Sequence, residues 1–187
     1  MAEKRKNWNG FMSGFKASDL VFLDESGCNT DMTRRYAYSL GGSRAVDSTP
    51  LSKPRNTTIL SSIQLDGTLR YTTFSGGTTV EKFKRYLEID LLPHLNGNSV
   101  LIMDNMKSHH AKAMKELLDS SGVRYIYLPP YSPDLNLIEK LWSKVKALLR
   151  KFKARTLDAL PNAIQNAFHS VTVFNRSGWF RSCEYAF

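Results

Sequence analysis

Three carboxylates occupy sequence positions that can bring them together at one edge of a sheet. Asp24 ends the apolar run Val21–Leu23, and Asp104 ends the apolar run Val100–Met103. Glu139 stands at the start of a long helical pattern, just after a proline-rich segment. Carboxylates at strand ends and at a helix start can converge and hold hard divalent cations, which prefer oxygen ligands.

Such a set of carboxylates suits phosphodiester cleavage. The reaction places charge on the attacking and leaving oxygens, and two divalent ions about 3.5–4 Å apart can stabilise both. Few carboxylates are needed, because magnesium keeps several waters and also uses phosphate oxygens. In this interpretation Asp24 bridges both ions, while Asp104 and Glu139 each complete one of them.

Each acid also has a structural explanation when it is taken alone. A strand-end aspartate is commonly a turn former. Asn136 and Glu139 resemble a capping box, in which the glutamate side chain returns to the backbone of the cap residue. Glu139 by itself fits capping better, and the three contexts taken together favour the metal site.

Composition points to a polyanionic partner. The 187 residues fit one domain with a real core, and the net charge is +9. A solvated basic surface is the alternative. Cys28 and Cys183 are far apart in sequence, which argues against a zinc knuckle or a disulfide framework and suits the cytoplasm. No run approaches the ~18 apolar residues of a membrane span, so no membrane partner is expected.

The apolar pattern predicts an α/β domain that must position these acids. Residues 1–18 are expected to be a basic tail or linker stub, and residues 19–187 one domain. The polar excursion over residues 28–56 is expected to hold a short strand at 36–39. The remaining elements are strands at 19–24, 57–65, 69–75, 99–103 and 123–128, and helices at 78–94, 111–121, 137–152 and 156–169. Their order suits a mixed sheet with helices on its faces.

Three motifs resemble the DDE transposases of the mariner-like superfamily, in particular its bacterial insertion-sequence branch. They are Leu-Asp-Glu-Ser-Gly at 23–27, Met-Asp-Asn-x-x-x-His at 103–109, and Leu-Pro-Pro-Tyr-Ser-Pro-Asp-Leu-Asn-Leu-Ile-Glu-Lys-Leu-Trp at 128–142. The last motif is long and highly specific. The spacing between Asp104 and Glu139 is also typical of that branch.

The resemblance implies a ribonuclease H-like fold: a mixed five-stranded sheet with helices on both faces. It implies cut-and-paste transposition, with hydrolysis at transposon ends followed by DNA strand transfer, and two Mg²⁺ ions, for which Mn²⁺ can substitute. Asp24, Asp104 and Glu139 become the metal-binding catalytic triad. Asn105 and His109 match motif positions with supporting roles, either orienting Asp104 or contacting phosphate. A polar cap on the following helix is the other explanation for His109.

Two departures from the family pattern affect what is expected. Leu137 stands where the family usually has proline, which raises a question about how firmly the helix begins. Only 18 residues precede the first predicted strand, too few for a helix-turn-helix module. The chain is therefore expected to act as a catalytic domain, with a separately encoded helix-turn-helix segment as a possible partner and a homodimer in the synaptic complex.

Double-stranded DNA, both transposon ends and target, is the expected partner. Trp142 is expected in the core rather than stacked on a base. Basic residues of the excursion and of the helix at 137–153 are candidates for phosphate contacts, with a solvated helix face as the alternative. These candidates are Arg34, Arg35, Arg44, Lys140 and Lys144. The rival functions are an inactive DNA-binding remnant and another ribonuclease H-like nuclease.

Overall fold

The computed structural model describes residues 7–34, 36–50, 54–66 and 68–185. Within this part, five strands form one sheet in the order β3-β2-β1-β4-β5. β1 pairs antiparallel with β2 and parallel with β4, so the sheet is mixed, as expected. The strands are β1 (Leu20–Asn29), β2 (Asn56–Gln64), β3 (Leu69–Ser75), β4 (Val100–Met103) and β5 (Arg124–Tyr127).

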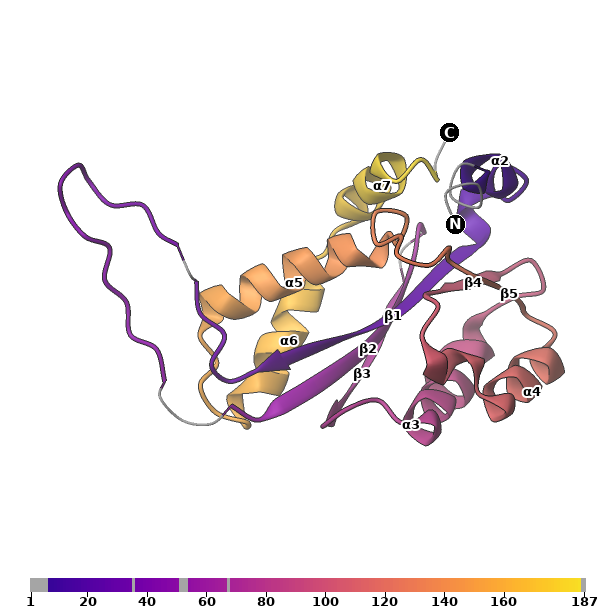
Figure 1. Cartoon of the computed structure of the whole chain (residues 1–187), viewed down its shortest axis with the longest axis horizontal. Helices are drawn as coiled ribbons and strands as arrows, with labels where there is room; N and C mark the ends of the chain where they lie inside the picture. The colour runs from indigo at the N-terminus through magenta and orange to yellow at the C-terminus, as the bar shows by residue number, and fades with distance from the viewer. Residues whose placement is uncertain (1–6, 35, 51–53, 67, 186–187) are drawn as a thin grey trace.

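Helices cover both faces of this sheet (Figure 1). α5 (Ile138–Phe152) and α6 (Ala159–His169) lie on one face, and α3 (Val80–Arg85) and α4 (Lys112–Ser121) lie on the other. Short 3₁₀ segments occur at Ala17–Asp19, Leu92–His94 and Lys107–His110. The α-helices are α2 (Trp8–Met12), α3 (Val80–Arg85), α4 (Lys112–Ser121), α5 (Ile138–Phe152), α6 (Ala159–His169) and α7 (Val173–Ser182). The helix expected over 78–94 is divided, because a π-helical segment, Tyr86–Leu91, follows α3 and Pro93 then enters a 3₁₀ turn.

Successive side chains of β1 point to opposite faces of the sheet and contribute to two separate hydrophobic cores. Leu20 and Phe22 join the core beneath α5 and α6, whereas Val21 and Leu23 join the core beneath α3 and α4. All four side chains are fully buried, which is typical of a central strand covered on both faces. β1 is therefore a rigid support for the residue that follows it, Asp24.

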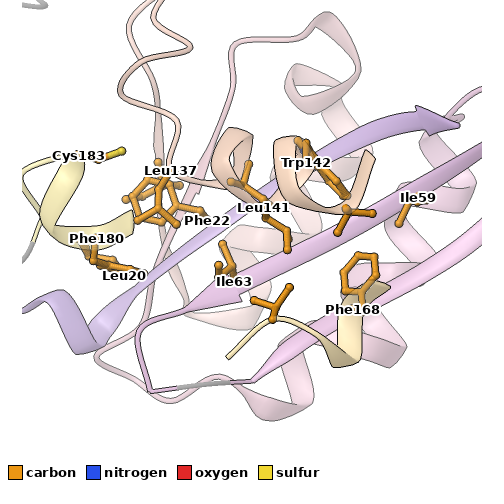
Figure 2. Packing of buried hydrophobic residues seen from close by; sticks show 14 of the residues in the cluster. Leu20, Phe22, Ile59, Ile63, Leu137, Leu141, Trp142, Phe168, Phe180 and Cys183 are labelled. Carbon is orange, nitrogen blue, oxygen red and sulfur yellow. The ribbon is translucent and has the colours of Figure 1, made fainter. Parts of the chain in front are cut away.

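The larger core lies between the sheet and the C-terminal helices. Figure 2 shows Phe22 of β1 close to Leu137 and Phe180, and Trp142 of α5 above Phe168 of α6. The rings of Phe22 and Phe180 meet edge to face with centroids 5.8 Å apart. These contacts fix α5, and with it Glu139, on the sheet.

Two segments differ from the sequence expectation. Residues 8–12 lie within the expected tail but form α2, because Trp8 and Met12 are buried in the larger core and Trp8 Nε1 donates to the Tyr185 hydroxyl at 2.7 Å. The expected strand at 36–39 is wrong. Tyr36 and Tyr38 are almost fully exposed and belong to a long loop that projects from the body (Figure 1), and no strand among the described residues pairs with it.

No helix in the described part of the chain is both long enough and apolar enough to cross a membrane.

Candidate active site

The parallel pairing of β1 with β4 brings two of the acids side by side. Leu23 pairs with Met103 in this ladder, so Asp24 and Asp104 follow at the same edge of the sheet. Glu139 reaches that edge from the first turn of α5. All three side chains line one cleft of about 540 Å³, which the loop between β5 and α5 also lines. Their role as metal ligands stays a prediction.

Two side chains around the start of α5 hold Asp24. Asn136 Nδ2 and Trp142 Nε1 donate to Asp24 Oδ2 at 3.3 Å and 3.2 Å, and the backbone N–H of Glu25 donates to Oδ1 at 2.8 Å. Asp24, Asn136 and Trp142 are all buried. The carboxylate is thus fixed to the helix that carries Glu139.

The environment of Asp24 disfavours its charged form. Burial raises the pKa of Asp24 to about 7, and repulsion from Asp104 adds to the effect. The hydrogen bond from the Glu25 N–H lowers the pKa but does not outweigh burial. Glu25 and Glu139 add further negative charge. A cation in the cleft would relieve this repulsion, so the site favours binding of positive charge.

His109 connects two acids beneath the cleft. Its Nδ1 lies 2.8 Å from Asp104 Oδ1, and its Nε2 lies 3.3 Å from Glu25 Oε2. Burial lowers the pKa of His109, but the hydrogen bonds to Asp104 and Glu25 outweigh it and raise the pKa to about 10. Both ring nitrogens can donate at once only in the imidazolium, so a protonated His109 would bind Asp104 and Glu25 together, and its supporting role stays a prediction.

We expect His109→Gln to lower the rate of DNA cleavage, because Asp104 loses the side chain that orients it. The same substitution should destabilise the fold by about 2 kcal/mol, because Glu25 loses its buried partner. The folded pKa of His109, about 10, lies above the ordinary histidine value of 6.5. Its stabilisation is therefore complete below about pH 6.5 and is lost as the pH rises through 10. Urea unfolding in EDTA should show the wild-type advantage shrinking between pH 6 and pH 10.

The control is His110→Gln, which alters a half-buried neighbour that contacts Asn105 rather than Asp104. A wild-type advantage over His109→Gln that stays constant across this pH range would contradict the imidazolium assignment.

The start of α5 does not have the capping box that was the structural explanation for Glu139. α5 follows Leu137 without a side-chain cap, so Asn136 and Glu139 do not form a capping box. The Asn136 amide binds Asp24 instead, and Glu139 is exposed in the cleft. Leu137 has φ −54° and ψ −34°, the helical values that proline also adopts, and it is fully buried. Burial therefore fixes the helix start in place of proline.

The remaining expected residues are dispersed. Asn105 lines the cleft, and Lys140 is exposed beside Glu139. Arg34 and Arg44 are exposed on the excursion, and Arg35 lies outside the described residues. Lys144 Nζ donates to the Ser170 carbonyl at 2.8 Å and to Asn175 Oδ1 at 2.6 Å, so it joins α5 to the α6–α7 junction. The proposed DNA contacts of these residues stay predictions.

Sequence reasoning missed three members of the site. Glu25 was passed over as a neighbour of Asp24, Asn136 was considered only as a cap, and Trp142 was expected in the core without its bond to Asp24. Trp142 stands one helical turn after Glu139, a spacing that places both on neighbouring positions of α5. This spacing is the sequence feature that could have placed Trp142 near the site. For Glu25 the sequence offers only its position next to Asp24.

The donor set of the cleft fits hard divalent cations. Four carboxylates line it, those of Asp24, Glu25, Asp104 and Glu139, and the buried oxygens Asn136 Oδ1 and Glu25 Oε1 have no hydrogen-bond partner among the described residues. In the described part of the chain, no three His, Cys, Asp or Glu side chains are already spaced as metal ligands. Magnesium needs few protein ligands, because it retains several waters and also binds phosphate oxygens.

We expect Mn²⁺ to stabilise the chain more at pH 8 than at pH 6. The raised pKa of Asp24, about 7, means that a proton competes with the cation below that pH. Displacing one proton weakens apparent affinity by up to about tenfold per pH unit below 7. A titration of thermal shift with Mn²⁺ at both pH values measures this, with Asp24→Asn as the control. Equal midpoints would contradict the prediction.

The mixed sheet, its helical layers and the acidic cleft at one edge define a ribonuclease H-like protein. The chain belongs to the DDE superfamily endonucleases, whose family model matches residues 19–161. A comparison with curated proteins gives no match.

Solved structures support the fold. A pre-cleavage Mos1 transpososome matches with a TM-score of 0.82 and 17% identity over 97% of this chain. The Mos1 mariner paired end complex with Mn matches with a TM-score of 0.82 and 18% identity over 97% of this chain. The chain spans 59% of each of these proteins. The catalytic domain of Mos1 mariner transposase matches with a TM-score of 0.73 and 15% identity, and the match covers 97% of this chain and 87% of that one. The expected ribonuclease H-like fold is confirmed.

Proposed function

We propose that this chain is the catalytic domain of a transposase that cuts DNA at transposon ends and joins the freed ends to target DNA. The observation that carries the proposal is the single cleft shared by Asp24, Asp104 and Glu139. Membership in the DDE endonuclease family makes DNA phosphodiesters the expected substrate. The +9 net charge suits a polyanionic partner.

Each acid has a separate part in this proposal. Asp24, which is held by Asn136 and Trp142, would bind the metal ions together with Asp104 and Glu139. When bound, two Mg²⁺ or Mn²⁺ ions supply Lewis acidity and lower the pKa of the attacking water. His109 keeps Asp104 oriented from below. The buried floor around Asp24 keeps bulk water from that carboxylate.

The proposed chemistry has two steps. In the first, a water oxygen attacks the scissile phosphorus, and the P–O3′ bond at the transposon end breaks, leaving a 3′-OH. In the second, this 3′-OH attacks a target phosphodiester, a new P–O bond forms, and the target strand releases its own 3′-OH. The number of phosphodiester bonds is conserved in the second step, so it needs no external energy source.

The partners follow from the proposed reaction. Double-stranded DNA is both substrate and target, and a homodimer would bring two ends together. The matched Mos1 structures are a transpososome and a paired end complex, and these assemblies are properties of Mos1. A separately encoded helix-turn-helix segment would supply recognition of the ends, and the expected location is the cytoplasm, in association with the nucleoid.

A strand-transfer assay tests the proposal. A duplex that ends in the inverted repeat flanking the coding region is incubated with a supercoiled plasmid and Mg²⁺ or Mn²⁺. A joined product is expected. Cleavage without joining would favour another ribonuclease H-like nuclease, and binding without cleavage would favour an inactive DNA-binding remnant.

A further inference from the structure

Tyr131 is an exposed aromatic residue at the rim of the acidic cleft. It lines the same cleft as Asp24 and Glu139, yet 88% of its surface is exposed. Its φ is +56°, in the left-handed region that residues other than glycine rarely adopt. Leu128 and Leu137, at either end of the same loop, are buried. The loop therefore anchors its ends in the core and presents Tyr131 to solvent.

The loop holds Tyr131 in a fixed relation to the carboxylates. Pro129, Pro130 and Pro133 restrict the backbone on both sides of it. At one end the Leu128 N–H donates to the Met103 carbonyl at 2.8 Å, next to Asp104. Further along the chain the Asn136 side chain donates to Asp24. Both ends of the loop are thus attached to residues that carry or adjoin the acids.

Burial of the Tyr131 ring contributes little to this arrangement. A left-handed backbone costs a residue with a Cβ about 1–2 kcal/mol, and an exposed ring recovers little of that cost through burial. Asparagine or glycine would adopt the same backbone with less strain. Strained residues that persist cluster at functional sites, and this one stands where a substrate would enter.

We propose that Tyr131 binds a nucleobase next to the scissile phosphate by stacking its ring on the base. The inference rests on the proposed function, because it needs DNA in the cleft. Bases inside an intact duplex already stack on both neighbours, so the contacted base must be unstacked. Tyr131 is then a positioning residue: it holds the strand so that the scissile phosphate faces Asp24 and Glu139.

The chemistry of the rim favours a base over a phosphate. The cleft beneath Tyr131 carries several carboxylates, whereas the tyrosine ring is neutral and offers a π face. Each base stacked on an aromatic side chain strengthens binding to single-stranded DNA by about 5- to 150-fold. The alternative to stacking is a hydrogen bond from the Tyr131 hydroxyl to a phosphate. That contact depends on the hydroxyl group and not on the aromatic ring.

Two substitutions separate these contacts. Tyr131→Asn keeps a residue that tolerates positive φ and removes the ring, while Tyr131→Phe keeps the ring and removes the hydroxyl. The matched control is Phe174→Ala, which removes a 78% exposed ring from α7. Affinity is measured in Ca²⁺ for duplexes that end in the flanking inverted repeat, either intact or with one abasic site on either side of the scissile phosphate.

On intact DNA, Tyr131→Asn should bind at least about 5-fold more weakly than wild type, and Tyr131→Phe within about 2-fold. On the duplex that lacks the contacted base, wild type and Tyr131→Asn should bind with the same affinity. If Tyr131 had only a structural role, the two proteins would still differ on that duplex. Phe174→Ala should match wild type throughout.

Three results would overturn the inference: equal binding of Tyr131→Asn and wild type to intact DNA, a Tyr131→Phe defect as large as that of Tyr131→Asn, or a Tyr131→Asn defect that survives every abasic position. Failure of the wild-type chain to cleave the intact repeat in Mg²⁺ or Mn²⁺ would instead overturn the proposed function, and the inference with it.

Discussion

Asp24→Asn is expected to lower DNA cleavage by at least about 1,000-fold while leaving the chain folded and able to bind DNA. Metal ions stabilise charge in the transition state by several kcal/mol, and each 1.4 kcal/mol is a factor of ten in rate. Asparagine has nearly the same shape as aspartate but removes the charge that both proposed cation sites share. Removing this charge also removes the electrostatic repulsion between Asp24 and Asp104, which adds to burial in raising the pKa of Asp24.

The measurement compares nicking of supercoiled plasmid and DNA affinity on the same protein preparation. Asp158→Asn is the matched control, because Asp158 is exposed at the start of α6 and its side chain forms no cap hydrogen bond. Asp158→Asn should nick at the wild-type rate. If Asp24→Asn cleaves as well as this control does, Asp24 has no place in the mechanism.

The edge position of Asp24 and Asp104 could be predicted from local sequence because each follows an unbroken apolar run. Such runs indicate buried strands, and parallel neighbours end at the same edge of a sheet. Glu139 was harder to place, since its local context fits a capping box. Only the longer motif around it favoured the cleft, and the uncapped start of α5 agrees with that choice.

The supporting contacts could not be predicted because they join residues that are distant in sequence. Asn136 and Asp24 are separated by 112 positions, and His109 and Glu25 by 84. A local pattern gives the type of each element but not the partner of a polar side chain. Trp142 illustrates this. Its apolar character correctly predicted that it is buried, but the acceptor of its Nε1 hydrogen bond, Asp24, is visible only in the packed structure.

Long-range packing also explains the two misplaced segments. The basic N-terminal residues suggested a tail, yet Trp8 is buried and bonded to Tyr185, 177 positions away. In the excursion a short strand is expected at 36–39, but a strand needs a neighbour to accept its backbone hydrogen bonds. The loop projects into solvent instead and brings Arg34 and Arg44 with it.

We expect this chain to bind duplex DNA weakly, with a strong dependence on salt and little sequence preference. Its +9 charge supplies phosphate contacts that release counterions and carry no base information. Neutralising about six phosphates would reduce affinity about 1,000-fold between 50 and 200 mM salt. Dissociation constants of about 10⁻⁴–10⁻⁶ M are expected at physiological salt. Competition binding with repeat and random DNA at two salt concentrations measures both properties.

Charge-removing variants locate the surface responsible. The double variant Arg34→Gln and Lys140→Gln removes two exposed cations, one on the excursion and one beside Glu139. If each contacts a phosphate, the slope of log affinity against log salt should become shallower by about 1.8. The matched control, Lys112→Gln with Lys115→Gln, removes two exposed cations from α4 on the opposite face of the sheet and should leave the slope unchanged. A large, salt-resistant preference for repeat DNA would contradict the prediction and would mean that this chain itself reads sequence, with the projecting excursion as the first segment to mutate.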